Sequence, residues 1–290
     1  MTIAVTGGNG AFGSAVLAHL RHRTDERLVA TVRDVAGSAA HPPRHEDVAY
    51  RFGDFDDPAA LRTALADVDT VLLNATFFGP DPGLRLPRVT AAVGAAADAG
   101  VRRIVLTSWP DLPNATVPVV QDYHRLEAAV REAGPDWTVL RLSAGIADAI
   151  ARDVVWGRSS GEVVAPAAGA RATPAAADDL GDAAAAVLAE PERHRGRILE
   201  LTGPDAIGWE EVAKAAGVPF RAVGEEEYLR HVRERFGVPE STARQLVELY
   251  RDFRGPWGST PTATLTELTG RPALPAIEAV RQRVAAFPAG

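Results

Sequence analysis

A glycine pattern near the start of the chain is the feature with the clearest chemical meaning. Its glycines recur at every third residue in a segment that reads Thr6-Gly7-Gly8-Asn9-Gly10-Ala11-Phe12-Gly13. Gly7 permits a tight turn, Gly10 lets backbone N–H groups approach a phosphate, and Gly13 allows a helix to pack closely on a strand. The segment follows an apolar run and opens a helical stretch, whose N-terminus adds N–H donors and a positive dipole. We therefore predict that these residues bind the diphosphate of a dinucleotide, with a purely structural turn as the alternative.

Residues at the ends of the next two apolar runs indicate which dinucleotide is bound. Arg33 closes the run 28–33, and an arginine at this position neutralises the 2′-phosphate of NADP(H). Asp34 follows it, and an acid would bind the ribose hydroxyls of NAD(H), so NAD(H) and a merely solvated arginine stay open as alternatives. Asp54 and Phe55 follow the run 48–52, where they would bracket an adenine, and Asp54 could equally cap the next helix.

Short apolar runs alternate with Ala- and Leu-rich stretches along the first half of the chain. We expect strands at residues 3–6, 28–33, 48–52, 70–75, 103–107 and 137–142, and helices at 11–22, 58–66, 84–99 and 121–133. Runs of this kind are apolar on both faces, which is typical of strands in a parallel sheet covered by helices. The predicted fold class is therefore α/β, with a doubly wound parallel sheet.

The pattern becomes less regular after residue 145. We expect strands at 162–165 and 197–201 and helices at 178–189, 209–216, 225–236, 240–253 and 275–286. The sequence predicts a dinucleotide-binding domain of residues 1–145, to which residues 178–203 return, and a smaller, mostly helical substrate lobe of residues 146–177 and 204–290. This lobe should pack on the carboxyl edge of the sheet and form a cleft there.

Composition narrows the class of function. The 290 residues carry a formal net charge of −7, which argues against a general nucleic-acid surface. Cysteine is absent, so disulfides, zinc-thiolate sites and thiol catalysis are excluded, and a cytoplasmic location is expected. We expect no membrane span and no signal peptide, because no run of about 18 apolar residues and no basic leader occurs. The seven histidines are scattered, so no metal site is expected, and the predicted partner is a small-molecule substrate of a monomer or homodimer.

Several segments together resemble a known family. The resemblance rests on the glycine loop, Arg33 and the segments 53–57, 101–108, 137–141 and 201–204. The chain resembles the NmrA-like group of atypical short-chain dehydrogenases/reductases, which includes triphenylmethane reductases, isoflavone-reductase-like enzymes and NADPH-dependent quinone reductases. The resemblance covers most of residues 1–220. It implies a Rossmann domain, a small C-terminal substrate lobe and NADP(H), in a group that contains both hydride-transfer enzymes and NADP-sensing regulators.

The resemblance also implies which residues contact the cofactor. The glycine loop and Arg33 would carry its phosphates, and Asp54 with Phe55 its adenine. The nicotinamide ribose and ring would lie along residues at three later strand ends, namely Asn74, Ala75, Thr76, Thr107, Ser108, Leu142 and Ser143.

The usual proton-donating pair of short-chain dehydrogenases is missing. That pair is Y-x-x-x-K, but the chain has one lysine, Lys214, and no tyrosine stands four residues before it. Glu127 stands four residues after Tyr123 and is expected to be an ordinary helix residue. We expect Ser108, Tyr123 or His124 to polarise the acceptor, with an exposed His124 and a packing role for Tyr123 as the alternatives.

The missing pair points to a particular kind of substrate. A simple ketone needs a positioned acid, whereas a quinone, enone or imine delocalises the developing charge. Aromatic residues near the strand ends suit a flat ligand or pack the core, namely Phe77, Phe78, Trp109 and Trp156. The predicted function is NADP(H)-dependent hydride transfer to a small, flat, conjugated molecule. An NADP-sensing regulator without turnover and a non-redox cyclase or isomerase stay open as alternatives.

Overall fold

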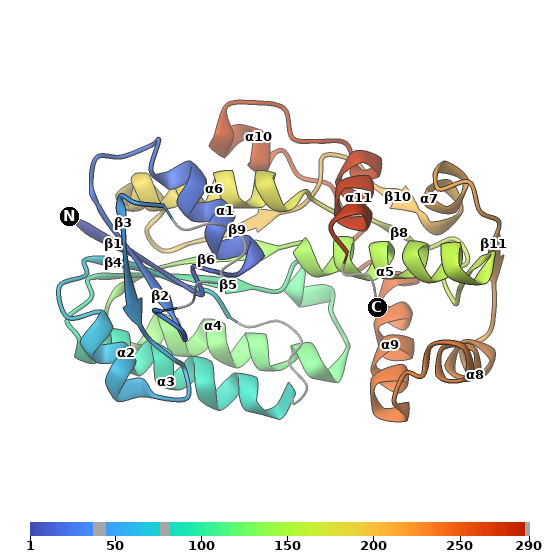
Figure 1. Ribbon diagram of the computed structural model, residues 1–290, viewed down its shortest axis with the longest axis horizontal. Helices are drawn as coiled ribbons and strands as arrows, with labels where there is room; N and C mark the ends of the chain where they lie inside the picture. The colour runs from blue at the N-terminus through green and yellow to red at the C-terminus, as the bar shows by residue number, and fades with distance from the viewer. Residues whose placement is uncertain (37–44, 76–81, 288–290) are drawn as a thin grey trace.

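A parallel sheet forms the centre of the computed structural model, which describes residues 1–36, 45–75 and 82–287. Seven strands in these ranges make up the sheet in the order β3-β2-β1-β4-β5-β6-β9 (Figure 1). They are β1 (Thr2–Thr6), β2 (Arg27–Val32), β3 (Val48–Phe52), β4 (Thr70–Leu73), β5 (Arg103–Ser108), β6 (Asp136–Leu142) and β9 (Arg197–Leu201). The strand order changes direction at β1, which pairs with β2 on one side and β4 on the other. This topology confirms the predicted doubly wound α/β fold, whose ligands bind at the carboxyl ends of the strands beside this switch point.

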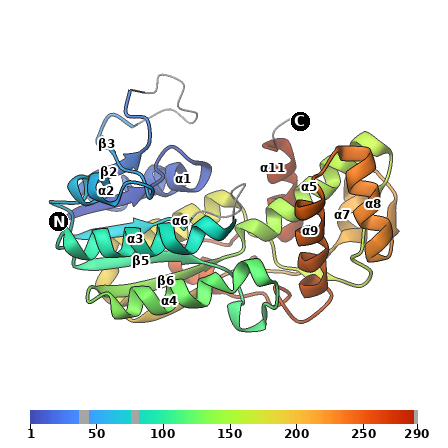
Figure 2. The ribbon, with the colours of Figure 1, turned by 90° about the horizontal axis from the view of Figure 1, so that it is seen from below.

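Helices cover both faces of the sheet, as Figures 1 and 2 show. One face carries α1 (Ala11–Leu20), α6 (Ala177–Ala189) and α10 (Thr264–Thr269), and the other carries α2 (Pro58–Ala64), α3 (Arg85–Asp98) and α4 (Asp122–Glu132). Alternate residues of β1 belong to the two resulting cores, with Ile3 and Val5 in one and Ala4 in the other. Both faces of the strands are apolar because helices cover both.

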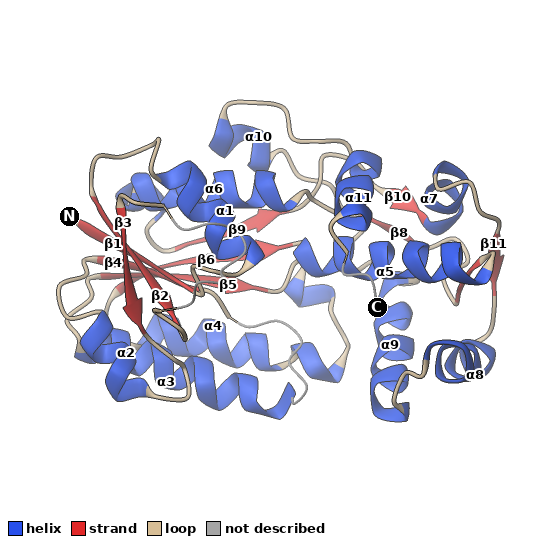
Figure 3. Cartoon of the chain, in the orientation of Figure 1, coloured by secondary structure: helices blue, strands red, loops and turns tan. Residues whose placement is uncertain are grey.

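The second half of the chain builds a helical lobe beside the carboxyl edge of the sheet (Figure 3). It contains α5 (Ala144–Ser160), α7 (Trp209–Ala215), α8 (Glu225–Phe236), α9 (Glu240–Phe253) and α11 (Ala276–Ala285). Two small sheets join it, one of β8 (Arg171–Ala172) with β10 (Ile207–Gly208) and one of β7 (Val163–Ala165) with β11 (Phe220–Ala222). From the same half of the chain, β9 pairs with β6 and α6 packs on α1.

The helix α5 is the main element that the sequence analysis missed. Its buried residues include Ile146, Ala149, Ile150 and Val154, which recur at the spacing of one helical face, so the sequence did carry a helical pattern here. Gly157 lowers the helix propensity of the segment. The structure explains this glycine, because a Cβ there would lie 2.5 Å from Cγ2 of Val163 on β7.

Hydrogen bonds tie the lobe to the loop that follows β5. Asp252 of α9 accepts from the backbone N–H groups of Thr116 and Val117, at 2.8 and 3.1 Å. The indole Nε1 of Trp257 donates to the carbonyl of Pro110 at 2.7 Å.

Within the described residues, no helix combines the length and apolar character that a membrane crossing requires.

Candidate active site

The glycine loop joins β1 to α1 and is held by its own backbone. Gly7 has a φ of +65°, and the N–H of Gly10 donates to the carbonyl of Gly7 at 2.9 Å. A Cβ on Gly13 would lie 2.4 Å from that same carbonyl oxygen, which is closer than real contacts allow. Gly8, to which the sequence analysis gave no role, is equally constrained, because its Cβ would lie 2.6 Å from that of Ala30 on β2. The loop therefore has the tight geometry that the sequence predicted.

The N-terminus of α1 is open to a ligand. Its N-cap residue is Gly10, and none of the described side chains caps the helix there. Asn9, Gly10 and Ala11 are exposed. The first-turn N–H groups and the helix dipole are thus available to a diphosphate, which fits the residues of this loop to a dinucleotide.

The residues assigned to the adenosine end lie beside this loop. Arg33 directly follows β2 and is exposed, and no described acidic side chain forms an ion pair with it. Asp54 Oδ1 accepts from the N–H of Asp56 at 3.1 Å, whereas Asp57 is the residue that caps α2, through the N–H of Ala60 at 3.0 Å. Asp54 is therefore not the helix cap that the sequence analysis considered. Phe55 is half-buried against the core.

Two threonine hydroxyls shape the end of β4. Thr6 Oγ1 donates to the carbonyl of Leu72 at 3.0 Å and accepts from the N–H of Asn74 at 2.8 Å. Thr107 Oγ1 accepts from the N–H of Ala75 at 2.8 Å and lies 3.4 Å from Asn74 Oδ1. These bonds fix the backbone where β4 ends. Thr76, Phe77 and Phe78, which the sequence analysis placed next, lie outside the described residues.

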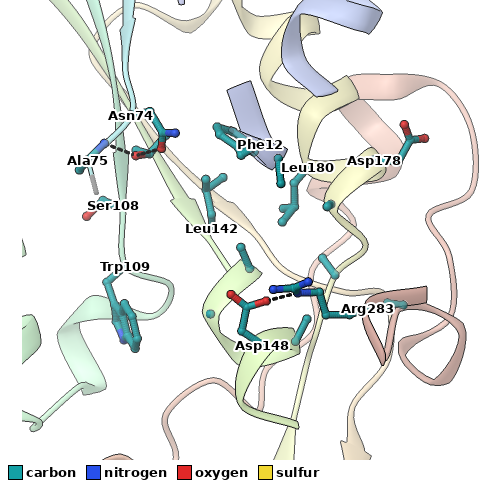
Figure 4. Close-up of a pocket in the computed structure, with 18 of the residues that line it drawn as sticks. Phe12, Asn74, Ala75, Ser108, Trp109, Leu142, Asp148, Asp178, Leu180 and Arg283 are labelled. Atoms are coloured by element: carbon teal, nitrogen blue, oxygen red, sulfur yellow. Dashed lines mark hydrogen bonds and ion pairs between the residues drawn. The ribbon is translucent and has the colours of Figure 1, made fainter. Parts of the chain in front are cut away.

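A pocket of about 480 Å³ opens at this edge of the sheet (Figure 4). Phe12 of α1, Leu142 of β6 and Leu180 of α6 give it apolar walls. Helix α11 of the lobe lines the opposite side, where Arg283 forms an ion pair with Asp148 of α5. The pocket thus lies between the strand ends and the lobe, and its wall is largely apolar with few polar groups, as is typical of sites for small organic ligands.

Leu142 and Ser143, at the end of β6, lie in different surroundings. Leu142 lines the pocket, whereas Ser143 is fully buried and is not among the lining residues. The backbone N–H of Ser143 donates to the carbonyl of Leu201, and its Oγ finds no hydrogen-bond partner among the described residues.

Ser108 lies in the pocket wall and belongs to a buried network of charges. Its hydroxyl donates to Oε1 of Glu127 at 2.8 Å. Arg141 binds both carboxylate oxygens of Glu127, at 2.8 and 2.9 Å, and also contacts Glu200 at 2.8 Å. Glu127 is 2% exposed, so the expectation of an ordinary helix residue was wrong. The sequence did not predict this network, because Ser108 and Arg141 come from β5 and β6, and only Arg131, four residues further along α4, is a local partner.

Tyr123 and His124 are neighbours on α4 but lie in different surroundings. Tyr123 is buried and lines the pocket, and burial raises the pKa of its phenol to about 12. The guanidinium of Arg85 lies 5.0 Å from the centre of its ring. His124 is exposed and is not among the residues that line the pocket, so the structure gives it no position from which to act there.

The two tryptophans of the expected aromatic wall are also separated. Trp109 lines the pocket and stacks on Trp257 of the lobe, with 5.4 Å between ring centres. Trp156 lies on α5 outside the pocket lining and stacks instead on Phe236 of α8, at 4.6 Å. The prediction that Trp156 belongs to the substrate wall is therefore corrected. Trp156 lies on α5, a helix that was not predicted, and this helix places it away from the sheet edge.

Metal chemistry has no site in the part of the chain that the structure describes. In these residues no three His, Cys, Asp or Glu side chains gather in a way that would hold a metal ion.

Comparisons with known proteins agree with this geometry. Residues 7–191 match the model of a family described as NAD(P)H-binding. The chain is 30% identical to the NAD(P)H azoreductase of Xenophilus azovorans, over 98% of this chain and 99% of that one. It is 26% identical to quinone oxidoreductase 2 of Escherichia coli (strain K12), over 96% and 97% of the two chains. The crystal structure of Citrobacter sp. triphenylmethane reductase complexed with NADP(H) superposes with a TM-score of 0.83, at 26% identity over 97% of this chain and 99% of that one.

Proposed function

Because the chain belongs to the NAD(P)H-binding family, as an NmrA-like atypical short-chain dehydrogenase/reductase, we propose that it reduces a small, flat, conjugated molecule with NADPH. The observation that carries this proposal is the largely apolar pocket that adjoins the glycine loop at the carboxyl ends of β4, β5 and β6. A ligand bound there would lie beside the nicotinamide end of a dinucleotide whose diphosphate occupies the loop.

Different residues of the first domain would bind different parts of the cofactor. Backbone N–H groups of the loop and of the first turn of α1 bind the diphosphate, and Arg33 neutralises the 2′-phosphate. Asp54 and Phe55 bracket the adenine, and Asn74 with Thr107 borders the nicotinamide ribose. When bound, NADPH supplies the hydride. We propose residues 146–177 and 204–290 as the substrate lobe, apart from α10, which packs on α6 and β9, with residues 178–203 returning to the cofactor domain.

The groups around the pocket favour an acceptor that spreads charge. Tyr123 has no lysine beside it, and burial holds the pKa of its phenol at about 12, so it donates a hydrogen bond as a neutral group. Hydride delivery then depends mainly on orientation between Phe12, Leu142 and Trp109. The names of the relatives support this substrate class, since azo compounds, quinones and triphenylmethane dyes are all delocalised acceptors.

The direct test is a panel of acceptors with NADPH as the donor. We expect NADPH oxidation, followed by its absorbance, with a quinone, an azo dye and a cationic triphenylmethane dye, and much slower oxidation with a simple dialkyl ketone. Faster turnover of the ketone would contradict the proposed substrate class. Binding of NADPH with no turnover of any acceptor would instead favour the NADP-sensing alternative.

Arg33→Ala tests the preference for NADPH over NADH. Removing a charge-assisted contact to the 2′-phosphate should weaken NADPH binding about ten- to hundredfold and leave NADH binding unchanged. Titration of cofactor fluorescence measures both affinities. Arg62→Ala, at an exposed position on α2, is the matched control and should alter neither. Equal losses for both cofactors in Arg33→Ala would remove the assigned role of this arginine.

A further inference from the structure

We propose that Glu127 is a positioning residue that holds Ser108 as a hydrogen-bond acceptor for the carboxamide N–H of the nicotinamide. The proposal rests on the proposed function, since it requires the nicotinamide to lie at the ends of β5 and β6. It changes the role that the sequence analysis gave to Ser108, from a group that donates to the acceptor into one that orients the cofactor.

The hydroxyl of Ser108 has a single hydrogen, and the structure shows where it goes. Oγ lies 2.8 Å from Oε1 of Glu127, and a carboxylate can only accept. Ser108 therefore has only lone pairs left for a ligand. A ligand group that binds to Oγ has to be a donor.

The charge on Glu127 is fixed by its neighbours. Arg141 contacts both oxygens of the carboxylate, and Arg131 adds a contact of 3.0 Å to Oε2 from the next turn of α4. Arg141 is held in turn by Glu200 of β9. Two guanidinium groups thus offset a carboxylate that is almost completely buried, and a charged acceptor gives the stronger hydrogen bond to Ser108.

Of the two hydroxyls at the end of β5, that of Ser108 is the better placed to accept from a ligand. The hydroxyl of Thr107 already accepts from Ala75 and contacts Asn74, so it is committed to the end of β4. Of the groups on a nicotinamide ring, the carboxamide N–H₂ carries the hydrogen-bond donors. Ser108 lies in the pocket wall at the end of β5, where such a ring would be flanked by Leu142. An acceptor with a fixed direction would select one rotation of the carboxamide and hence orient the ring.

The test compares two cofactors that differ in this donor. The 3-acetylpyridine analogue of NADPH replaces the carboxamide N–H₂ by a methyl group and keeps the carbonyl. We expect the wild type to bind NADPH about three- to tenfold more tightly than the analogue, as one hydrogen bond predicts. Ser108→Ala and Glu127→Gln should both reduce this preference to near one, and the double variant should be no different from Ser108→Ala. Dissociation constants from fluorescence titration give the readout without turnover.

Glu200→Gln is the matched control. It weakens the same arginine but does not touch Ser108, so the preference for the carboxamide should persist even where stability falls. If Glu127→Gln fails to fold, Ser108→Ala still tests the proposal, because it leaves the charged network intact. An undiminished preference in Ser108→Ala, or a wild type that binds both cofactors equally, overturns the inference. A wild type that binds neither cofactor would instead contradict the proposed function.

Discussion

The two ends of the candidate cofactor site are built in different ways. The diphosphate end consists of backbone from consecutive residues and is exposed at Asn9, Gly10 and Ala11. A ligand can approach this backbone closely because the glycines of the loop carry no side chains. The nicotinamide end depends on buried side chains, in which Ser108, Glu127 and Arg141 meet from three separate elements. The first end should therefore be sensitive to added atoms and the second to a removed charge.

Gly13→Ala should have the largest effect on cofactor binding. Its Cβ would lie 2.4 Å from the carbonyl oxygen of Gly7, and the nearest atoms all belong to the backbone of Gly7 and Gly8, so no flexible side chain can move aside. We expect the loop to shift and NADPH affinity to fall at least about a hundredfold, measured by calorimetry. Gly94→Ala on α3 is the control, because nothing lies within 4 Å of its added Cβ. Its affinity for NADPH should be unchanged, and its melting temperature should be unchanged or slightly raised. Wild-type affinity in Gly13→Ala would show that the close approach is not needed.

Arg141→Met should act on stability rather than on the loop. It leaves Glu127 buried without its bidentate partner, and breaking a buried pair in this way costs about 3–5 kcal/mol of unfolding free energy. Urea unfolding, followed by circular dichroism, measures the loss. The exposed pair of Arg244 with Glu240 is the control, and Arg244→Met should hardly change the unfolding midpoint. Equal effects of the two substitutions would mean that the buried network contributes no more than a surface pair.

The same difference explains how much the sequence could predict. The glycine loop and the strands are local patterns, and runs such as 48–52 and 197–201 form β3 and β9 with the expected bounds. The network around Glu127 depends on which strands become neighbours, and no spacing along the chain encodes the pairing of β6 with β9. Helix α5 was missed although Ile146, Ala149, Ile150 and Val154 recur at helical spacing, since Gly157 weakens the helix propensity of the segment. The error over Trp156 followed directly from that omission.

The smallest expected effect concerns Tyr123 and the pH dependence of kcat/KM. In a Tyr-Lys pair the lysine lowers the pKa of the tyrosine, whereas here burial raises the pKa of Tyr123 to about 12. The phenol therefore stays protonated as pH rises through 10, and Tyr123 should add no ionisation to the profile of kcat/KM between pH 7 and 10. Tyr123→Phe should lower kcat/KM only a few-fold and leave the shape of that profile unchanged. An ionisation below pH 10 that disappears in Tyr123→Phe would contradict this prediction and restore the tyrosine as an acid with a lowered pKa.

The raised pKa also sets the sign of an effect on stability. The unfolded chain releases the phenol proton near pH 10 and the folded chain only near 12, so the stabilisation is present below pH 10 and is lost as pH rises toward 12. Tyr123→Phe should make the unfolding free energy fall less steeply across that window. Tyr228 in the lobe is the matched control, because burial also raises the pKa of its phenol and it does not line the pocket. Tyr228→Phe should flatten the same alkaline loss without changing kcat/KM, which separates the effect of burying a phenol from that of placing one in the pocket wall.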